Sequence, residues 1–69
     1  MNEIDRLTKE QRAAVARVIA KARKEPGQQS EDGGAWDAYA YQLGDGRIAW
    51  GVNAPHNIAR GVVSGGRRP

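Results

Sequence analysis

The sequence holds few side chains that could do chemistry, and its one familiar glycine motif lies in the wrong context. The segment Gly44-Asp45-Gly46-Arg47-Ile48-Ala49 has the G-x-G-x-x-A spacing with which many proteins hold a dinucleotide phosphate. Such a site requires a helix directly after the glycines, inside a parallel βαβ unit. Arg47–Val52 is instead typical of a strand. The motif therefore predicts a hairpin turn and not a nucleotide site.

Catalytic and metal-binding groups are also sparse. The chain has one histidine, His56, and no cysteine, which excludes a thiolate nucleophile, a disulfide and a zinc site of paired ligands. Ser64 is the nearest hydroxyl, but no acid is spaced to orient His56 toward it. Glu31, Asp32 and Asp37 lack the alternating spacing of a calcium loop. We therefore expect no catalytic residue, no metal and no cofactor.

Length and composition limit what the chain can be. With 69 residues it is near the lower limit for a core without disulfides or metal, so we expect one domain over residues 1–64 and a disordered basic tail over residues 65–69. The absence of cysteine fits a reducing, cytoplasmic compartment. No apolar run approaches the roughly 18 residues of a membrane span. We therefore expect no membrane association.

The charges are divided into zones along the chain. The net charge is +3, with a mostly basic segment up to Gly27, acids alone from Gln28 to Gly46, and cations alone from Arg47 onward. Two basic zones that merge in space would favour an anionic partner. Solubility and attraction between segments are the alternative explanation of this pattern.

An amphipathic helix is predicted over Lys9–Lys24. Thr8 and Gln11 have the spacing of a capping box, and Pro26-Gly27 ends the helix. One side of this helix is apolar and predicts the contact with the rest of the core, formed by Leu7, Ala14, Val15, Val18, Ile19 and Ala22.

A loop and a β-hairpin should follow. Gln28–Gly34 is polar and has no periodicity, which predicts a loop. Trp36–Leu43 and Arg47–Val52 read as two strands, and a two-residue turn at Asp45-Gly46 would pair Tyr41 with Trp50. That register places the large side chains on one face beneath the helix: Tyr39, Tyr41, Leu43, Ile48, Trp50 and Val52. A three-residue loop would pair Tyr41 with Ala49 and break up that face.

The last third of the chain is ambiguous between two structures. Asn53 can cap a short helix that ends before Gly61, whereas Ile58–Val63 also reads as a strand. The capping residues favour the helix. The predicted fold is therefore α+β, a helix on a hairpin with a short C-terminal helix or third strand.

Two surfaces are candidates for binding. Tyr39, Tyr41 and Trp50 would form a stacking platform for single-stranded nucleic acid if their face were open, but the helix needs that face as its cover. The other face of the hairpin predicts a flat surface with a tryptophan at its rim: Trp36, Ala38, Ala40, Gln42, Ala49 and Gly51. The alternative is that the C-terminal segment folds over this surface, which would make Trp36 part of the core.

The expected function is binding without catalysis. The leading hypothesis is a small protein-binding module or inhibitor that occupies a surface of a larger protein or nucleoprotein assembly, and its positive charge suits an acidic target. The alternative is a small basic nucleic-acid-binding accessory or regulatory protein, based on the basic zones and the Arg67-Arg68 tail. The residues expected to contact a partner are Trp36, Gln42, Arg47, Arg60, Arg17 and Lys21.

Overall fold

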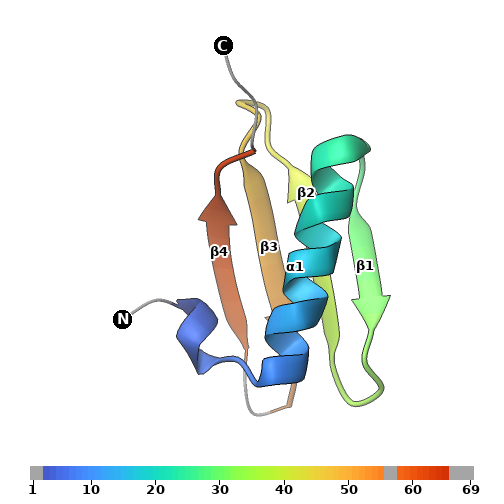
Figure 1. The fold of residues 1–69 in the computed structure, drawn as a ribbon, viewed down its shortest axis with the longest axis vertical. Coiled ribbons are helices and arrows are strands. Elements are labelled where there is room, and N and C mark those ends of the chain that lie inside the picture. Colours follow the sequence, from blue (N-terminus) through green and yellow to red (C-terminus); the bar gives the residue numbers. More distant parts are fainter. Residues whose placement is uncertain (1–2, 56–57, 66–69) are drawn as a thin grey trace.

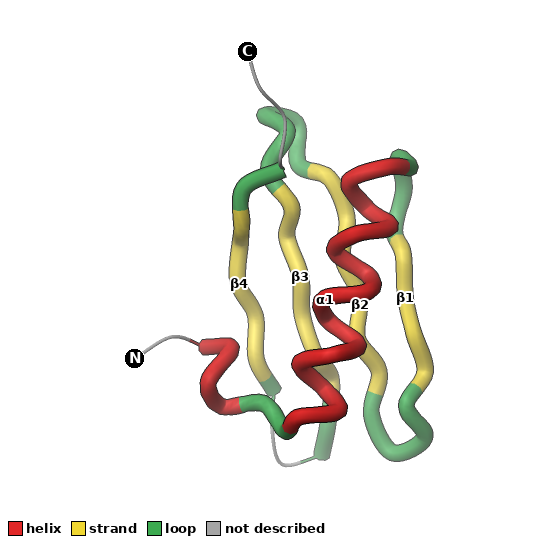
Figure 2. Tube along the Cα trace, viewed as in Figure 1, coloured by secondary structure: helices red, strands yellow, loops and turns green. Residues whose placement is uncertain are grey.

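One helical layer lies on one layer of antiparallel sheet in the computed structural model, which describes residues 3–55 and 58–65 (Figure 1 and Figure 2). A short 3-10 helix, η1 (Glu3–Arg6), precedes the long helix α1 (Lys9–Lys24). Four strands follow: β1 (Gln29–Asp32), β2 (Asp37–Gln42), β3 (Ile48–Asn53) and β4 (Ala59–Val63). Each strand pairs antiparallel with the next, in the order β1-β2-β3-β4. The α+β class expected from the sequence is confirmed.

The ends of α1 are fixed by local side chains, as the sequence predicts. The backbone N–H of Gln11 donates to the Thr8 hydroxyl at 3.1 Å, and the backbone N–H of Thr8 donates to the Gln11 side-chain carbonyl at 3.0 Å. This reciprocal capping box satisfies backbone groups that a helix start leaves without partners. At the other end Glu25 has extended backbone and is followed by Pro26, which cannot continue the helix. The predicted span of the helix is confirmed.

The core lies between α1 and one face of the sheet, which we call the covered face. The apolar side of α1 is buried as predicted, through Leu7, Ala14, Val15, Val18, Ile19 and Ala22. The sheet meets it with two kinds of side chain, small ones on β2 and larger ones on β3: Ala38, Ala40, Ile48, Trp50 and Val52, joined by Ala59 of β4. Alanines on β2 allow the helix backbone to approach closely, while Trp50 fills the space beside it.

The predicted register of the hairpin is wrong by one residue. The loop is the three-residue one, Gly44–Gly46, closed by the Leu43 N–H to the Arg47 carbonyl at 2.8 Å. Gly46 has a φ of +91°, a left-handed conformation typical of the last position in such a loop. Tyr41 therefore pairs with Ala49 and not with Trp50. The shift turns Tyr39 and Tyr41 away from the helix, so they are not core residues.

The segment predicted as a loop, Gln28–Gly34, contains strand β1. Its residues pair with β2 from Gln29 with Ala40 to Asp32 with Asp37. An edge strand of this kind is held by backbone hydrogen bonds and needs no apolar residue of its own. The sequence Gln-Ser-Glu-Asp gives it no hydrophobic pattern, and this is why the strand was not predicted.

The favoured C-terminal helix is wrong and the alternative strand is observed, because Asn53 ends β3 and Ala59–Val63 forms strand β4. Gly61 is not a helix terminator but the site of a close approach. A Cβ at Gly61 would lie 2.6 to 2.7 Å from atoms of the Trp50 indole, so the ring lies directly over this glycine. Of the predicted tail over residues 65–69 only Gly65 is described, and residues 66–69 and His56 lie outside the described residues.

The turn conformation can be tested with matched glycine substitutions. Gly46→Ala should lower the free energy of unfolding by about 1 to 2 kcal/mol, because an L-residue is disfavoured at this positive φ. Gly44→Ala should be neutral or slightly stabilising, because Gly44 has no positive φ and open space around it. Urea denaturation measures both. Equal stability of the two variants would contradict the three-residue loop.

A second pair of variants tests which side of α1 is buried. Val18 is fully buried and Ala16 is exposed on the same helix. Val18→Asp should abolish folding, since the free-energy cost of burying an unpaired charge exceeds the roughly 3 to 5 kcal/mol of stability that a core of this size supplies. Ala16→Asp should cost less than about 1 kcal/mol through helix propensity alone. Far-UV circular dichroism distinguishes the two, and a folded Val18→Asp variant would refute the packing of α1.

Candidate functional site

The sheet face opposite α1 is covered by no helix or strand of the described chain, and we call it the open face. Strand alternation and the pairing of the strands place these residues on it: Ser30, Asp32, Asp37, Tyr39, Tyr41, Ala49, Gly51, Asn53, Arg60 and Val62. Ile58 precedes the buried Ala59 and so shares this side of the strand direction. The side chains are positioned by the register of the sheet and not by mobile loops.

Two stacked tyrosines form the centre of the open face. The rings of Tyr39 and Tyr41 lie 6.3 Å apart between centroids, at an interplanar angle of 11°. A Cβ at Gly51 would lie 2.3 to 2.7 Å from atoms of the Tyr39 ring, so this ring lies low over β3 where no side chain stands in the way. Tyr41 beside it faces Ala49, another small residue. The result is a broad, shallow aromatic surface.

Exposed apolar area is concentrated on this face. Among the described residues, the exposed large hydrophobic side chains are Tyr41 at 37%, Ile58 at 53% and Val62 at 50%. The strand pairing places Tyr41 and Val62 on the open face, and alternation before the buried Ala59 puts Ile58 on the same side. Isolated exposed hydrophobic residues are normal on a protein, but several on one uncovered face mark a surface that excludes water when a partner binds.

The charges of the open face are mixed. Arg60 is exposed and pairs across the sheet with Gly51, while Asp32 and Asp37 pair with each other at one end of β1 and β2. One carboxylate oxygen of Asp32 accepts the backbone N–H of Gly34 at 2.9 Å. An apolar centre is therefore flanked by acids on one side and by a cation on the other.

Arg47, predicted to contact a partner, is engaged within its own turn. Its Nε donates to Asp45 Oδ2 at 2.7 Å and its backbone N–H donates to Asp45 Oδ1 at 3.1 Å. The pKa of the Asp45 carboxyl is lowered, first by the backbone hydrogen bond from Arg47 and then by the Arg47 side chain. Arg47 thus stabilises the loop that sets the hairpin register.

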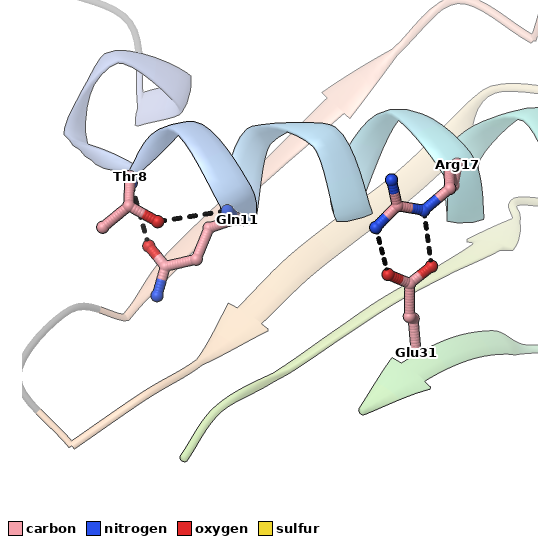
Figure 3. Close-up of polar contacts among 4 residues, drawn as sticks. All are labelled: Thr8, Gln11, Arg17 and Glu31. Atoms are coloured by element: carbon pink, nitrogen blue, oxygen red, sulfur yellow. Dashed lines mark hydrogen bonds and ion pairs between the residues drawn. The ribbon is translucent and has the colours of Figure 1, made fainter. Parts of the chain in front are cut away.

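Arg17 and Lys21 lie on the helical side of the molecule, away from the open face. Arg17 donates two hydrogen bonds to Glu31 of β1: one from Nε to Oε1 at 2.9 Å, and one from Nη2 to Oε2 (Figure 3). These hydrogen bonds are the first cause of the lowered pKa of Glu31, with smaller contributions from the charges of Arg17 and Lys21, and the pKa of Arg17 is raised in return. The pair ties the edge strand to the helix.

Trp36 and Gln42 also belong to the helical side. Trp36 is half-buried against the core, and its ring lies so close to Gly33 that a Cβ there would be 2.4 Å away. It borders a surface hollow together with residues of α1 and β1: Glu10, Ala13, Arg17, Glu31 and Gly33. The Gln42 side chain donates from Nε2 to the carbonyl of Ala22 at 2.8 Å, near the end of α1.

The predicted flat surface is therefore not one surface. Trp36, Ala38, Ala40 and Gln42 lie on the helical side, whereas Ala49 and Gly51 lie on the open face. The described structure covers the first group with α1 and not with the C-terminal segment. Of the six predicted contact residues, Arg60 lies on the open face, and the other five are distributed over the hairpin loop and the helical side.

Two of the three residues of the aromatic platform considered from the sequence lie on the open face. Tyr39 and Tyr41 lie on the open face, but Trp50 is only 3% exposed and belongs to the covered face. The two-residue turn predicted from the sequence places both tyrosines in the core, so they were not expected at the surface. The signal that could have found them is the second glycine of Gly44-Asp45-Gly46, which fits a three-residue loop ending in a left-handed residue.

Metal and membrane sites have no support in the part of the chain that the structure describes. Residues 3–55 and 58–65 contain no group of three or more His, Asp or Glu side chains arranged to hold a metal ion. Within the same ranges no helix combines the length and apolarity that a membrane crossing requires. His56, the histidine weighed above as a catalytic candidate, lies outside the described residues.

The pair between Arg17 and Glu31 gives a test of the attachment of β1. A double-mutant cycle with Arg17→Gln and Glu31→Gln should show a favourable coupling at neutral pH, small because Arg17 is 57% exposed. Glu31 has a lowered pKa in the folded state, so the coupling is complete above the ordinary glutamate value of about 4.3 and is lost as the pH falls through the folded value. Urea denaturation at several pH values measures it. A coupling that grows on acidification would contradict the assignment.

Comparisons with known proteins give no relative from which a function could be inferred, so the function is argued from the geometry of the site. No family model, no curated protein and no solved structure matches this chain.

Proposed function

We propose that this chain is a small protein-binding module whose docking surface is the open face of the sheet. The observation that supports the proposal is the position of the exposed large hydrophobic side chains Tyr41 and Val62 on the sheet face that α1 leaves uncovered, with the exposed Ile58 just before β4. A chain this small would gain stability by burying such residues, so leaving them at the surface has a cost that binding offsets.

The chemistry of the face suits a protein partner. Tyrosine offers a large, rigid ring with a polar end and is enriched among the residues that dominate interface energies, as is arginine. Small residues at Ala49 and Gly51 leave the surface shallow enough for a flat partner surface to contact both rings. Ser30, Asp32 and Asn53 supply a polar border of the kind that surrounds the buried centre of many interfaces.

A nucleic acid fits this face less well, despite the tyrosine pair. Binding of single strands combines stacking with a groove of cations that follows the phosphates. Here Asp32 and Asp37 offset Arg60, and the charge of Arg47 is paired with Asp45. The cations of α1 lie on the opposite side of the sheet. The nucleic-acid alternative therefore becomes an outcome of the test and not the proposal.

The test is site-specific photo-crosslinking in the native host, with probes on the two sides of the molecule. A photo-reactive residue at Val62 reports on the open face, and one at Ala20 on the exposed side of α1 is the matched control. We expect a protein adduct of defined mass from position 62 and none from position 20. A nuclease-sensitive adduct, or adducts from both positions alike, would overturn the proposal.

Competition makes this test specific for the tyrosines. Excess unlabelled wild-type chain should suppress the adduct. The Tyr41→Ala variant should need about 30-fold higher concentration for the same suppression, since a central interface aromatic contributes roughly 2 kcal/mol of binding free energy. Ala16→Ser, on the exposed side of α1, should compete like the wild type. Equal competition by Tyr41→Ala and Ala16→Ser would show that the open face does not bind the partner.

A further inference from the structure

We infer that the partner of the open face is a second copy of this chain, packed sheet against sheet as a symmetric dimer. The inference rests on the proposed function, because it takes the open face to be a protein-binding surface and names what binds there. It is carried by the arrangement of large, small, acidic and basic residues in rows across the four strands, which is complementary to itself under one symmetry axis.

The rows follow directly from the strand pairing. The middle row runs across the sheet as Ser30, Tyr39, Gly51 and Arg60. The next row contains Tyr41, Ala49 and Val62, and the row at the other end contains Asp32, Asp37 and Asn53, with Ile58 continuing that row just before β4. Tyrosines therefore occupy β2, small residues occupy β3, the cation lies on edge strand β4, and an acid lies on edge strand β1.

Two sheets that pack face to face as a symmetric pair can be related by a two-fold axis along the strands or across them. An axis along the strands, between β2 and β3, lays β4 of one copy over β1 of the other. Arg60 then lies over Ser30 of the second copy, next to Asp32 two residues along that strand. Tyr39 lies over Gly51 and Tyr41 over Ala49, so each large side chain meets a small one.

The axis across the strands gives the opposite result. It lays each strand over its own equivalent, and when it passes through the middle row it places Arg60 over Arg60 and Tyr39 over Tyr39. The first arrangement brings Arg60 near Asp32 at both edges and joins complementary volumes in the centre, and it also lays Asp32 over Ile58. The second lays the middle row on itself, cation on cation and tyrosine on tyrosine. The rows of the open face therefore select the axis along the strands, with the usual crossing of about 30° between packed sheets.

The size of the face sets the expected affinity. Four strands about 4.8 Å apart, four to six residues long at 3.4 Å per residue, make a face of roughly 19 by 14 to 20 Å. Such a face belongs to the small class of interfaces, below about 1,200 Å² in total, which are typically weak. We expect a dissociation constant on the order of 1 to 100 µM, and hence monomer and dimer in a concentration-dependent equilibrium.

A charge-swap experiment tests the dimer and its axis together. In sedimentation velocity, wild-type chain should pass from monomer to dimer between about 1 µM and about 1 mM. Arg60→Glu should face Asp32 of the second copy, and Asp32→Arg should face Arg60, so each variant alone should bind itself at least about 100-fold more weakly. Mixing the two variants should restore a dimer, because both edge contacts then join opposite charges. The chain that carries both substitutions should also dimerise with itself.

Controls separate this contact from a general charge effect. Arg12→Glu and Glu25→Arg make the same changes of charge on exposed residues of the helical side and should leave the equilibrium unchanged. Asp32 also accepts the Gly34 N–H, and Asp32→Asn keeps an acceptor for this hydrogen bond. This variant should weaken the dimer while its circular dichroism spectrum stays unchanged, which checks that the turn remains folded. Recovery of the dimer in the mixture shows that both charge variants are folded.

The outcomes distinguish this inference from the proposed function. A wild-type chain that remains monomeric to about 1 mM, or a dimer that Arg60→Glu and Asp32→Arg leave intact, overturns the second copy as the occupant. The proposed function is decided separately, since an adduct at Val62 with a different protein would support it even then. An adduct at twice the mass of the chain, together with rescue in the mixture, supports both.

Discussion

The register between β2 and β3 is the constraint on which the rest of the structure depends. The loop Gly44–Gly46 needs a left-handed last residue, and Gly46 adopts it without strain. That loop pairs Ala40 with Trp50, so β2 presents alanines to α1 and tyrosines to the other side. A shift of one residue would exchange the two sets and place both tyrosine rings beneath the helix, where the observed close approach of α1 leaves no room for them.

The attachment of α1 then follows from packing, with polar contacts at its margins. Trp50 lies over Gly61 and fills the space beside the alanines, and Val15, Val18 and Ala22 close the core from the helix. Gln42 satisfies the Ala22 carbonyl near the helix end, and Arg17 ties the edge strand β1 through Glu31. An exposed ion pair contributes little to stability compared with burial of the core side chains. The pair therefore orders the strand edge more than it holds the domain together.

The parts of the fold that depend on local chemistry could be predicted from the sequence, and the parts that depend on tertiary fit could not. The two ends of α1 are set by residues close to them in the sequence, the capping box at Thr8 and the stop at Pro26. Its span could therefore be predicted. Strand β1 is held by backbone pairing with β2 and needs no apolar pattern, so the sequence carries no signal for it. The sequence left two alternatives open, a two- or three-residue hairpin loop and a C-terminal helix or strand. Packing against α1 and Trp50 decides between them. Arg60 was expected at a binding surface, but the tyrosines were assigned to the core.

The order of the strands has a consequence for how the chain reaches this structure. Because every strand pairs with its neighbour in sequence, the sheet closes only short loops, and the loss of chain entropy at each step is small. Contacts of short sequence separation favour rapid folding, and each new strand can add to an edge that already exists. Partly folded states with unpaired edges are then short-lived, which limits the time in which the aromatic side of the sheet could join other chains in disordered aggregates.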